Sequence, residues 1–297
     1  MEICRECVRE CGAFREEHLV PGGKYGFCRA PRSAVLARAA LHFWEEPCIS
    51  GKRGSGTVFF SGCNLRCVYC QNYEVSHSVK GKEVSVERLK EIYSELIEKG
   101  AHNINLVTPG HYTSVILQSL PEPLPVPVVY NTNGYDKLEN LKKLEGKIQI
   151  YLPDLKYADD SLARELSHAP NYFETAKAAI REMFRQTGPF EMDEEGMLKK
   201  GVVIRHLLLP GNVENTLRVI DFVAETFKPG EVLFSLMRQY TPCGETEKFP
   251  FLSRKITPEE YEKVEKHLFD SGIEDGFVQE EESACEEFIP LFDGTGV

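Results

Sequence analysis

Six short apolar segments, each followed by a longer amphipathic one, constrain the fold of this chain more than any other feature. The apolar segments show little strict alternation of polar and apolar residues, which is typical of strands covered on both faces. We predict strands at Thr57–Ser61, Asn103–Val107, Val126–Tyr130, Ile148–Leu152, Val202–Leu209 and Val232–Leu236. This order predicts an α/β fold with a parallel sheet and right-handed crossovers. Because six units are too few for a closed eight-stranded barrel, we expect a partial (β/α)6 TIM-like barrel, with a doubly wound open sheet as the alternative.

The segments between these strands carry apolar residues at helical spacing. We predict helices at Val86–Lys99, Tyr112–Leu120, Lys137–Leu144, Tyr172–Gln186, Val213–Thr226 and Pro258–Ser271. Ser85 is a predicted N-cap, and Pro258 stands at a first helical position after Thr257.

Two stretches fall outside the alternation. Residues 1–54 are rich in Cys and Arg, and we predict that they form a metal-binding appendage to a core of residues 55–297. Residues 189–200 contain Asp193-Glu194-Glu195-Gly196 between short flanks, which predicts a hairpin inserted before the fifth strand.

Charge and composition limit the partners of the chain. The formal net charge of −11 argues against a nucleic-acid-binding protein, which normally has a basic face. No segment is long and apolar enough to span a bilayer, and the N-terminus has no apolar signal region. We therefore expect a cytoplasmic protein without nucleic-acid or membrane partners. In a reducing compartment, its ten cysteines are expected to bind metal or serve redox chemistry rather than form disulfides.

Cys63, Cys67 and Cys70, here called the triplet, directly follow the first predicted strand. In barrel-like α/β folds the loops at the carboxyl ends of the strands carry the chemistry. Three thiolates cannot complete the four-ligand set of a structural zinc site or of a cubane cluster, so a cubane held by three of them leaves one iron open. A zinc knuckle with a distant fourth ligand, or three buried thiols, is the alternative.

The triplet, with the aromatic Tyr69 just before its third cysteine, resembles the signature of radical S-adenosylmethionine (SAM) enzymes. In that family the amino and carboxylate groups of SAM chelate the open iron of a [4Fe-4S] cluster. One electron from the reduced cluster then cleaves SAM to methionine and a 5′-deoxyadenosyl radical, which abstracts hydrogen from a substrate. The resemblance also implies a one-electron donor such as flavodoxin or ferredoxin.

Later strand ends resemble the activating enzymes of glycyl-radical enzymes, such as pyruvate formate-lyase activating enzyme. The matching segments are Asn131-Thr132-Asn133-Gly134 and Pro153-Asp154-Leu155-Lys156. The resemblance implies that Asp154 binds near the ribose or a bound cation and that Lys156 pairs with the SAM carboxylate. The cofactor-binding residues that it implies are Tyr69, Thr108, Asn131, Thr132, Asp154 and Lys156.

Longer segments make nearly the whole chain similar to the PflX group, which is related to these activases. They include Ala39–Gly51, Ala101–Pro109 and Phe292–Val297. The resemblance implies an oxidoreductase that activates a glycyl-radical enzyme by abstracting hydrogen from a backbone glycine. The alternatives are a radical SAM enzyme acting on a small metabolite or peptide, and a non-catalytic iron–sulfur binding protein.

Cys4, Cys7, Cys11 and Cys28, here called the quartet, form a second predicted metal site. Four thiolates are a closed set, which suits structural zinc or an auxiliary iron–sulfur cluster. Similar quartets occur in the PflX group. The spacing does not decide between zinc, a second cluster and unliganded thiols, and Cys48 is an alternative fourth ligand.

Three other side chains have open roles. His111 follows the second predicted strand, where an ordinary loop histidine is favoured slightly over a cofactor contact. Cys243 and Cys285 stand alone, and lone thiols are more often inert than catalytic.

Overall fold

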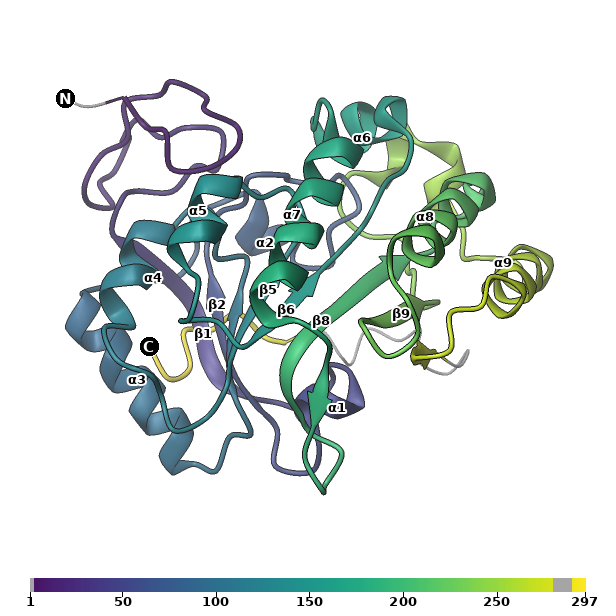
Figure 1. The fold of residues 1–297 in the computed structure, drawn as a ribbon. Coiled ribbons are helices and arrows are strands. Elements are labelled where there is room, and N and C mark those ends of the chain that lie inside the picture. Colours follow the sequence, from purple (N-terminus) through teal and green to yellow (C-terminus); the bar gives the residue numbers. More distant parts are fainter. Residues whose placement is uncertain (1–2, 280–289) are drawn as a thin grey trace.

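A computed structural model describes residues 3–279 and 290–297 and shows one curved sheet with helices packed along its outer side (Figure 1). In this part of the chain the sheet has ten strands in the order β10-β9-β8-β6-β5-β4-β2-β1-β3, with β7 paired to β8. The strands are β1 Ala34–His42, β2 Ser55–Phe60, β3 Lys82–Val84, β4 Ile104–Val107, β5 Val128–Thr132, β6 Ile150–Pro153, β7 Glu191–Met192, β8 Leu198–Leu207, β9 Leu233–Met237 and β10 Gly276–Val278.

The six predicted strands all form, with bounds shifted by up to four residues, as β2, β4, β5, β6, β8 and β9. Each pairs in parallel with the next. Their crossovers place helices on the outer, convex side, where one large apolar core joins helices and sheet. The fold is therefore the predicted partial TIM-like barrel, not the open doubly wound sheet.

The predicted helices also form, as α3 Val86–Glu98, α4 Thr113–Ser119, α5 Leu138–Lys143, α7 Tyr172–Thr187, α8 Val213–Thr226 and α9 Pro258–Asp270. Ser85 caps α3 by accepting a hydrogen bond from the Arg88 amide, and Thr257 forms a capping box with Glu260 at the start of α9. Three shorter α-helices are α1 Pro47–Ser50, α2 Tyr73–Ser76 and α6 Asp160–Ser167, and 3-10 turns lie at Thr246–Lys248 and Pro250–Ser253. Between α7 and β8, the short strand β7 forms an antiparallel hairpin with the start of β8.

The appendage is shorter than predicted, because residues 34–50 are part of the core. β1 pairs antiparallel with both β2 and β3. Beyond β1 the chain turns under the barrel, where Cys48 and Ile49 of α1 pack against apolar side chains of β5, β6, β8 and β9. These residues were missed because β1 does not follow the strand–helix alternation. Residues 3–33 contain no helix or extended strand and lie at the end of the sheet opposite α1 (Figure 1).

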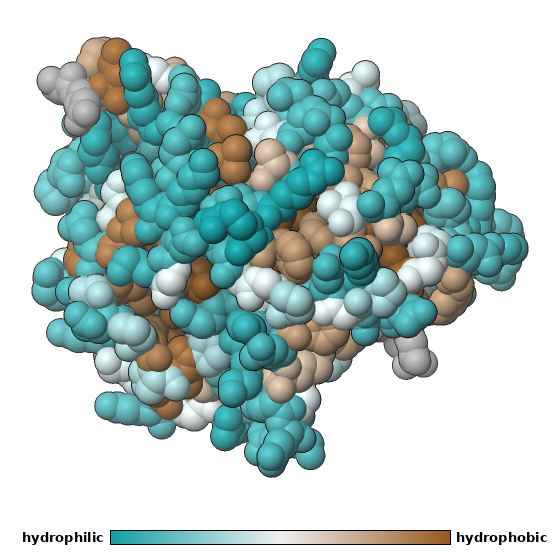
Figure 2. Space-filling model, in the orientation of Figure 1, coloured by the Kyte–Doolittle hydropathy of each residue, from teal (hydrophilic) through white to brown (hydrophobic). Residues whose placement is uncertain are grey.

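Figure 2 shows that the helical face of the molecule is mainly hydrophilic, with scattered hydrophobic patches. None of the helices in the described residues is long and apolar enough to cross a membrane.

Candidate active site and cofactor pocket

A cavity of about 760 Å³ opens on the concave side of the sheet, and the triplet lines it. Its walls come from the loops after several parallel strands and from the end of β1. This size lies within the range of pockets that hold a cofactor or small ligand. The cavity also contains every predicted cofactor-binding residue, namely Tyr69, Thr108, Asn131, Thr132, Asp154 and Lys156.

The triplet loop is fixed by contacts that its sequence dictates. Gly62 adopts φ +84°, and a Cβ atom there would stand 2.5 Å from the Cys28 carbonyl oxygen, so only glycine fits. The Leu65 amide donates to Cys63 Sγ (3.3 Å) and the Ser167 hydroxyl to Cys67 Sγ (3.0 Å). Hydrogen bonds of this kind orient the sulfurs and tune a cluster held by them.

The donor chemistry of the triplet fits an iron–sulfur cluster. Burial, and next the charge of Cys67, raises the pKa of Cys63, and the same two causes raise that of Cys70 to about 12. Thiols this close together and this desolvated are held protonated until a cation replaces their protons. No three His, Cys, Asp or Glu side chains of the described residues are arranged to hold one metal ion. The assignment therefore depends on the thiol set and on the space beside it.

Asp154 and Lys156 form a partly buried ion pair at the carboxyl end of β6. Lys156 Nζ lies 2.7 Å from Asp154 Oδ2, and Arg205 Nε lies 2.9 Å from Asp154 Oδ1. Although burial favours the neutral carboxyl, the charges of Arg205 and Lys156 lower the pKa of Asp154 overall. Both groups are therefore charged at neutral pH, and the Lys156 ammonium keeps donors beyond the one that Asp154 accepts.

Thr108 and Thr132 line the same cavity, Thr108 with an unusual backbone conformation and Thr132 with its hydroxyl bonded to a buried acid. Thr108 has φ +58°, a strained conformation for a β-branched residue, and such strain concentrates at functional sites. The Thr132 hydroxyl donates to Asp136 Oδ2 (2.6 Å). Burial raises the pKa of Asp136 to about 6. The sequence analysis did not single out Asp136.

Below these residues lies a polar layer that sequence reasoning also missed. Glu45 accepts hydrogen bonds from Asn105 (3.2 Å), Asn131 (3.0 Å) and Arg205 (2.8 Å). Arg205 Nη2 also donates to Asn131 Oδ1 (2.7 Å). The Asn131 amide is therefore committed to protein groups at both of its ends. The sequence signal for this layer is a lone polar residue inside an apolar strand, such as Asn105 or Arg205.

Two of the residues with open roles, His111 and Cys243, do not line the cavity. His111 is buried, its Nε2 lies 2.9 Å from the Ser61 carbonyl oxygen, and burial lowers its pKa to about 3, so it serves as a neutral structural group. The Cys243 thiol donates to the Tyr69 carbonyl oxygen (3.2 Å). Cys285 lies outside the described residues.

The quartet lies in the appendage, and among the described residues its thiols are not arranged to hold one metal ion. Burial, and then the charges of Cys28, Cys4 and Cys11, raise the pKa of Cys7 to about 12, so the four thiols lie within electrostatic reach of one another. Arg9 stands between Cys7 and Cys11 in the sequence. Its side chain donates hydrogen bonds to the carbonyl oxygens of Asn64, Ser167 (3.0 Å) and His168 (2.7 Å). Arg9 thus joins the appendage to the triplet loop.

Comparison with known proteins agrees with this geometry. Residues 57–223 match the family model of the Radical SAM superfamily. An uncharacterized protein of Methanocaldococcus jannaschii is 30% identical over 272 residues, which cover 88% of this chain and 72% of that protein.

Solved structures are similar at low sequence identity. Streptococcus suis SuiB bound to S-adenosylmethionine is 14% identical with a TM-score of 0.50, covering 73% of this chain and 48% of SuiB. This chain therefore spans about half the length of SuiB. A domain of pyruvate-formate lyase-activating enzyme from Bacteroides vulgatus is less similar, with 14% identity and a TM-score of 0.40 over 58% of this chain and 91% of that domain. The family match spans more than half of the sequence and includes the triplet, and the chain belongs to the radical SAM superfamily.

Proposed function

We propose that this chain reductively cleaves SAM and directs the resulting radical to hydrogen abstraction, in the manner of a glycyl-radical-enzyme activase of the PflX group. The observation that carries the proposal is the meeting of the triplet with Asp154 and Lys156 in one cavity. When bound, the cluster and SAM together supply a one-electron cleavage that yields methionine and a 5′-deoxyadenosyl radical.

The residues of the chain have separate tasks in this proposal. Cys63, Cys67 and Cys70 would be the protein ligands of the cluster. Lys156 binds the SAM carboxylate, because a partly buried ammonium with free donors is its natural partner. Asp154 holds that ammonium in place and lies toward the ribose. Tyr69, Thr108, Asn131 and Thr132 complete the wall and exclude water from the radical.

The electron comes from a one-electron donor of the flavodoxin or ferredoxin type. The abstraction step balances as transfer of one hydrogen atom from the substrate carbon to the radical, which leaves 5′-deoxyadenosine and a substrate radical. The quartet is proposed to hold zinc or an auxiliary cluster that stabilises the appendage against the triplet loop.

Anaerobically reconstituted protein, reduced with dithionite, tests this proposal. Methionine and 5′-deoxyadenosine should form in equal amounts, and a glycyl-radical enzyme from the same cell should acquire a glycyl radical signal in electron paramagnetic resonance. An intact cluster that neither binds nor cleaves SAM would favour a non-catalytic iron–sulfur protein instead.

A small metabolite or a peptide is the second candidate substrate. The Glu46 carboxyl group in the cavity wall favours it, because a glycine backbone brings no charged partner for that group. SAM cleavage without a radical on any glycyl-radical enzyme would support this second candidate.

A further inference from the structure

The wall of the cavity contains buried side-chain atoms that lack a hydrogen-bond partner; within the described residues Asn105 Oδ1, in the polar layer around Glu45, lacks one too but does not line the cavity. Glu46 Oε2 and Ser235 Oγ are buried and lack a hydrogen-bond partner among the residues that the structure describes. The Glu46 side chain is 5% exposed and Ser235 is 1% exposed. Both residues line the cavity that the triplet lines.

Arg205 forms an ion pair with Glu46 without a hydrogen bond, because each of its three nitrogens is held by another partner. Its Nε binds Asp154, its Nη1 binds Glu45 and its Nη2 binds Asn131. The distance from Arg205 Nη1 to Glu46 Oε2 is 3.9 Å, beyond hydrogen-bond range. Burial raises the pKa of Glu46, whereas the charge of Arg205 and the nearby Ser235 hydroxyl lower it. A buried carboxylate left in this state costs stability, which favours a role with a ligand.

The charge of the cavity indicates the sign of that ligand. Apart from the cysteines, the charged residues that line it are the acidic Glu45, Glu46 and Asp154 and the basic Lys156 and Arg205. They leave one formal negative charge, and the unpaired atoms are a carboxylate oxygen and a hydroxyl oxygen. A cationic nitrogen with several N–H donors complements both.

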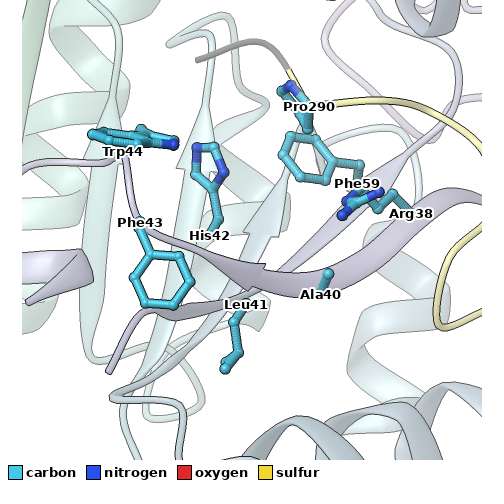
Figure 3. Close-up of a pocket in the computed structure, with 8 residues that line it drawn as sticks. All are labelled: Arg38, Ala40, Leu41, His42, Phe43, Trp44, Phe59 and Pro290. Carbon is cyan, nitrogen blue, oxygen red and sulfur yellow. The ribbon is translucent and has the colours of Figure 1, made fainter. Parts of the chain in front are cut away.

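The walls above this pair indicate what the nitrogen is attached to. Phe59, Val107, Leu207, Met237 and Phe277 supply apolar surface to the same cavity. A smaller pocket adjoins the cavity at the end of β1. Aromatic side chains line it, with His42 and Trp44 on the same side of the strand as Phe59 and Pro290 (Figure 3). A stem of a few methylene groups matches such a passage.

We propose that Glu46 and Ser235 form the inner end of the substrate site and bind a cationic amine carried on a short apolar stem. The inference rests on the proposed radical chemistry in the same cavity. The amine belongs either to a small molecule or to a lysine side chain of a peptide, and the two sources share this chemistry.

Calorimetric titration of the reconstituted protein with n-butylamine, n-butanol and the peptide acetyl-Gly-Lys-Gly-amide tests the inference. At least one of the two amines should bind while butanol does not. Glu46→Gln should weaken amine binding at least tenfold, whereas the same change at the exposed Glu194 should not. Tighter binding of the peptide identifies a lysine side chain, and tighter binding of butylamine identifies a small amine. Absence of amine binding, or unchanged binding by Glu46→Gln, overturns the inference.

A melting experiment without ligand separates a binding role from a structural one. Glu46→Gln removes a desolvated charge, so its melting temperature should equal or exceed that of the wild type. Glu45→Gln breaks a saturated network and should lower it. If Glu46→Gln lowers the melting temperature as much as Glu45→Gln, Glu46 is structural and the inference is overturned.

SAM cleavage by the wild type is measured separately. Cleavage without amine binding defeats only the substrate inference, and amine binding without cleavage defeats only the proposed function.

Discussion

The triplet and the quartet lie close together in the molecule, but the fold supports them differently. The triplet follows a buried strand and lines a large cavity. The quartet lies in loops, where Cys11 is exposed and Cys4 and Cys7 are half-buried. Three thiols beside a cavity would leave a metal position open to a reactant, whereas a closed set of four would stabilise a loop segment too short to build a core. We therefore expect chemistry at the triplet and stabilisation at the quartet.

The largest effect is expected from substitutions in the triplet. Alanine at Cys63, Cys67 or Cys70 should abolish the cluster at that site and reduce SAM cleavage to background, because no spare thiol lines the cavity within the described residues. Iron counting with absorption spectroscopy measures the loss. If the variant with all three cysteines replaced retains all of its iron, the assignment of the cluster to the triplet is wrong. If that variant retains some metal, its analysis shows whether the quartet holds zinc or iron.

The quartet should affect stability before activity. Cys7→Ser should release its metal and lower the melting temperature by roughly 10 °C, since metal binding by such loops is folding free energy. The iron of the triplet should stay bound. Cys243→Ser, which changes a lone thiol in the same way, serves as the control. Equal melting temperatures for both variants would mean that the quartet holds no metal.

A smaller effect tests the link between the two sites. Arg9→Gln removes charged hydrogen bonds to the carbonyl oxygens of the triplet loop and of Ser167. We expect a chelator to remove iron from the triplet of this variant about three to ten times faster than from the triplet of the wild type. Arg5→Gln, at an exposed position between two quartet cysteines, should leave that rate unchanged. Identical rates for both variants would show that the sites are independent.

A pH-dependent effect concerns Asp136, a buried acid that accepts a hydrogen bond from Thr132 of the cavity wall. Burial raises its pKa from 3.8 to about 6 in the folded chain. Its contribution to stability is therefore complete below about pH 4 and is lost as the pH rises through about 6. Relative to the wild type, Asp136→Asn should gain up to about 3 kcal/mol of unfolding free energy between pH 4 and pH 7.

Thermal melts across this range measure the change, as a widening gap in melting temperature between the two proteins. Glu194→Gln, at an exposed carboxylate, should show no pH-dependent gap. A constant gap for Asp136→Asn would mean that the carboxyl ionises as it does in water.

Much of the fold was readable from local patterns. Strand–helix alternation predicted the six parallel strands, and Ser85 and Thr257 marked helix starts, because capping acts within a few residues. The strand β1 was missed because it pairs antiparallel with β2, outside the repeating unit. The segment after it carries Glu45 and Glu46, so the polar layer of the cavity was missed with it.

The sequence by itself determined the superfamily of the chain, because the spacing of three thiols after a buried strand is a local property of the chain. It also determined which strand-end residues face one cavity, since parallel strands bring their carboxyl ends to one edge. Only the tertiary structure decided that Arg205 joins Glu45, Asp154 and Asn131, and that Glu46 Oε2 and Ser235 Oγ lie buried beside them. These contacts join residues up to 160 positions apart, and burial sets their strength, so no local pattern encodes them.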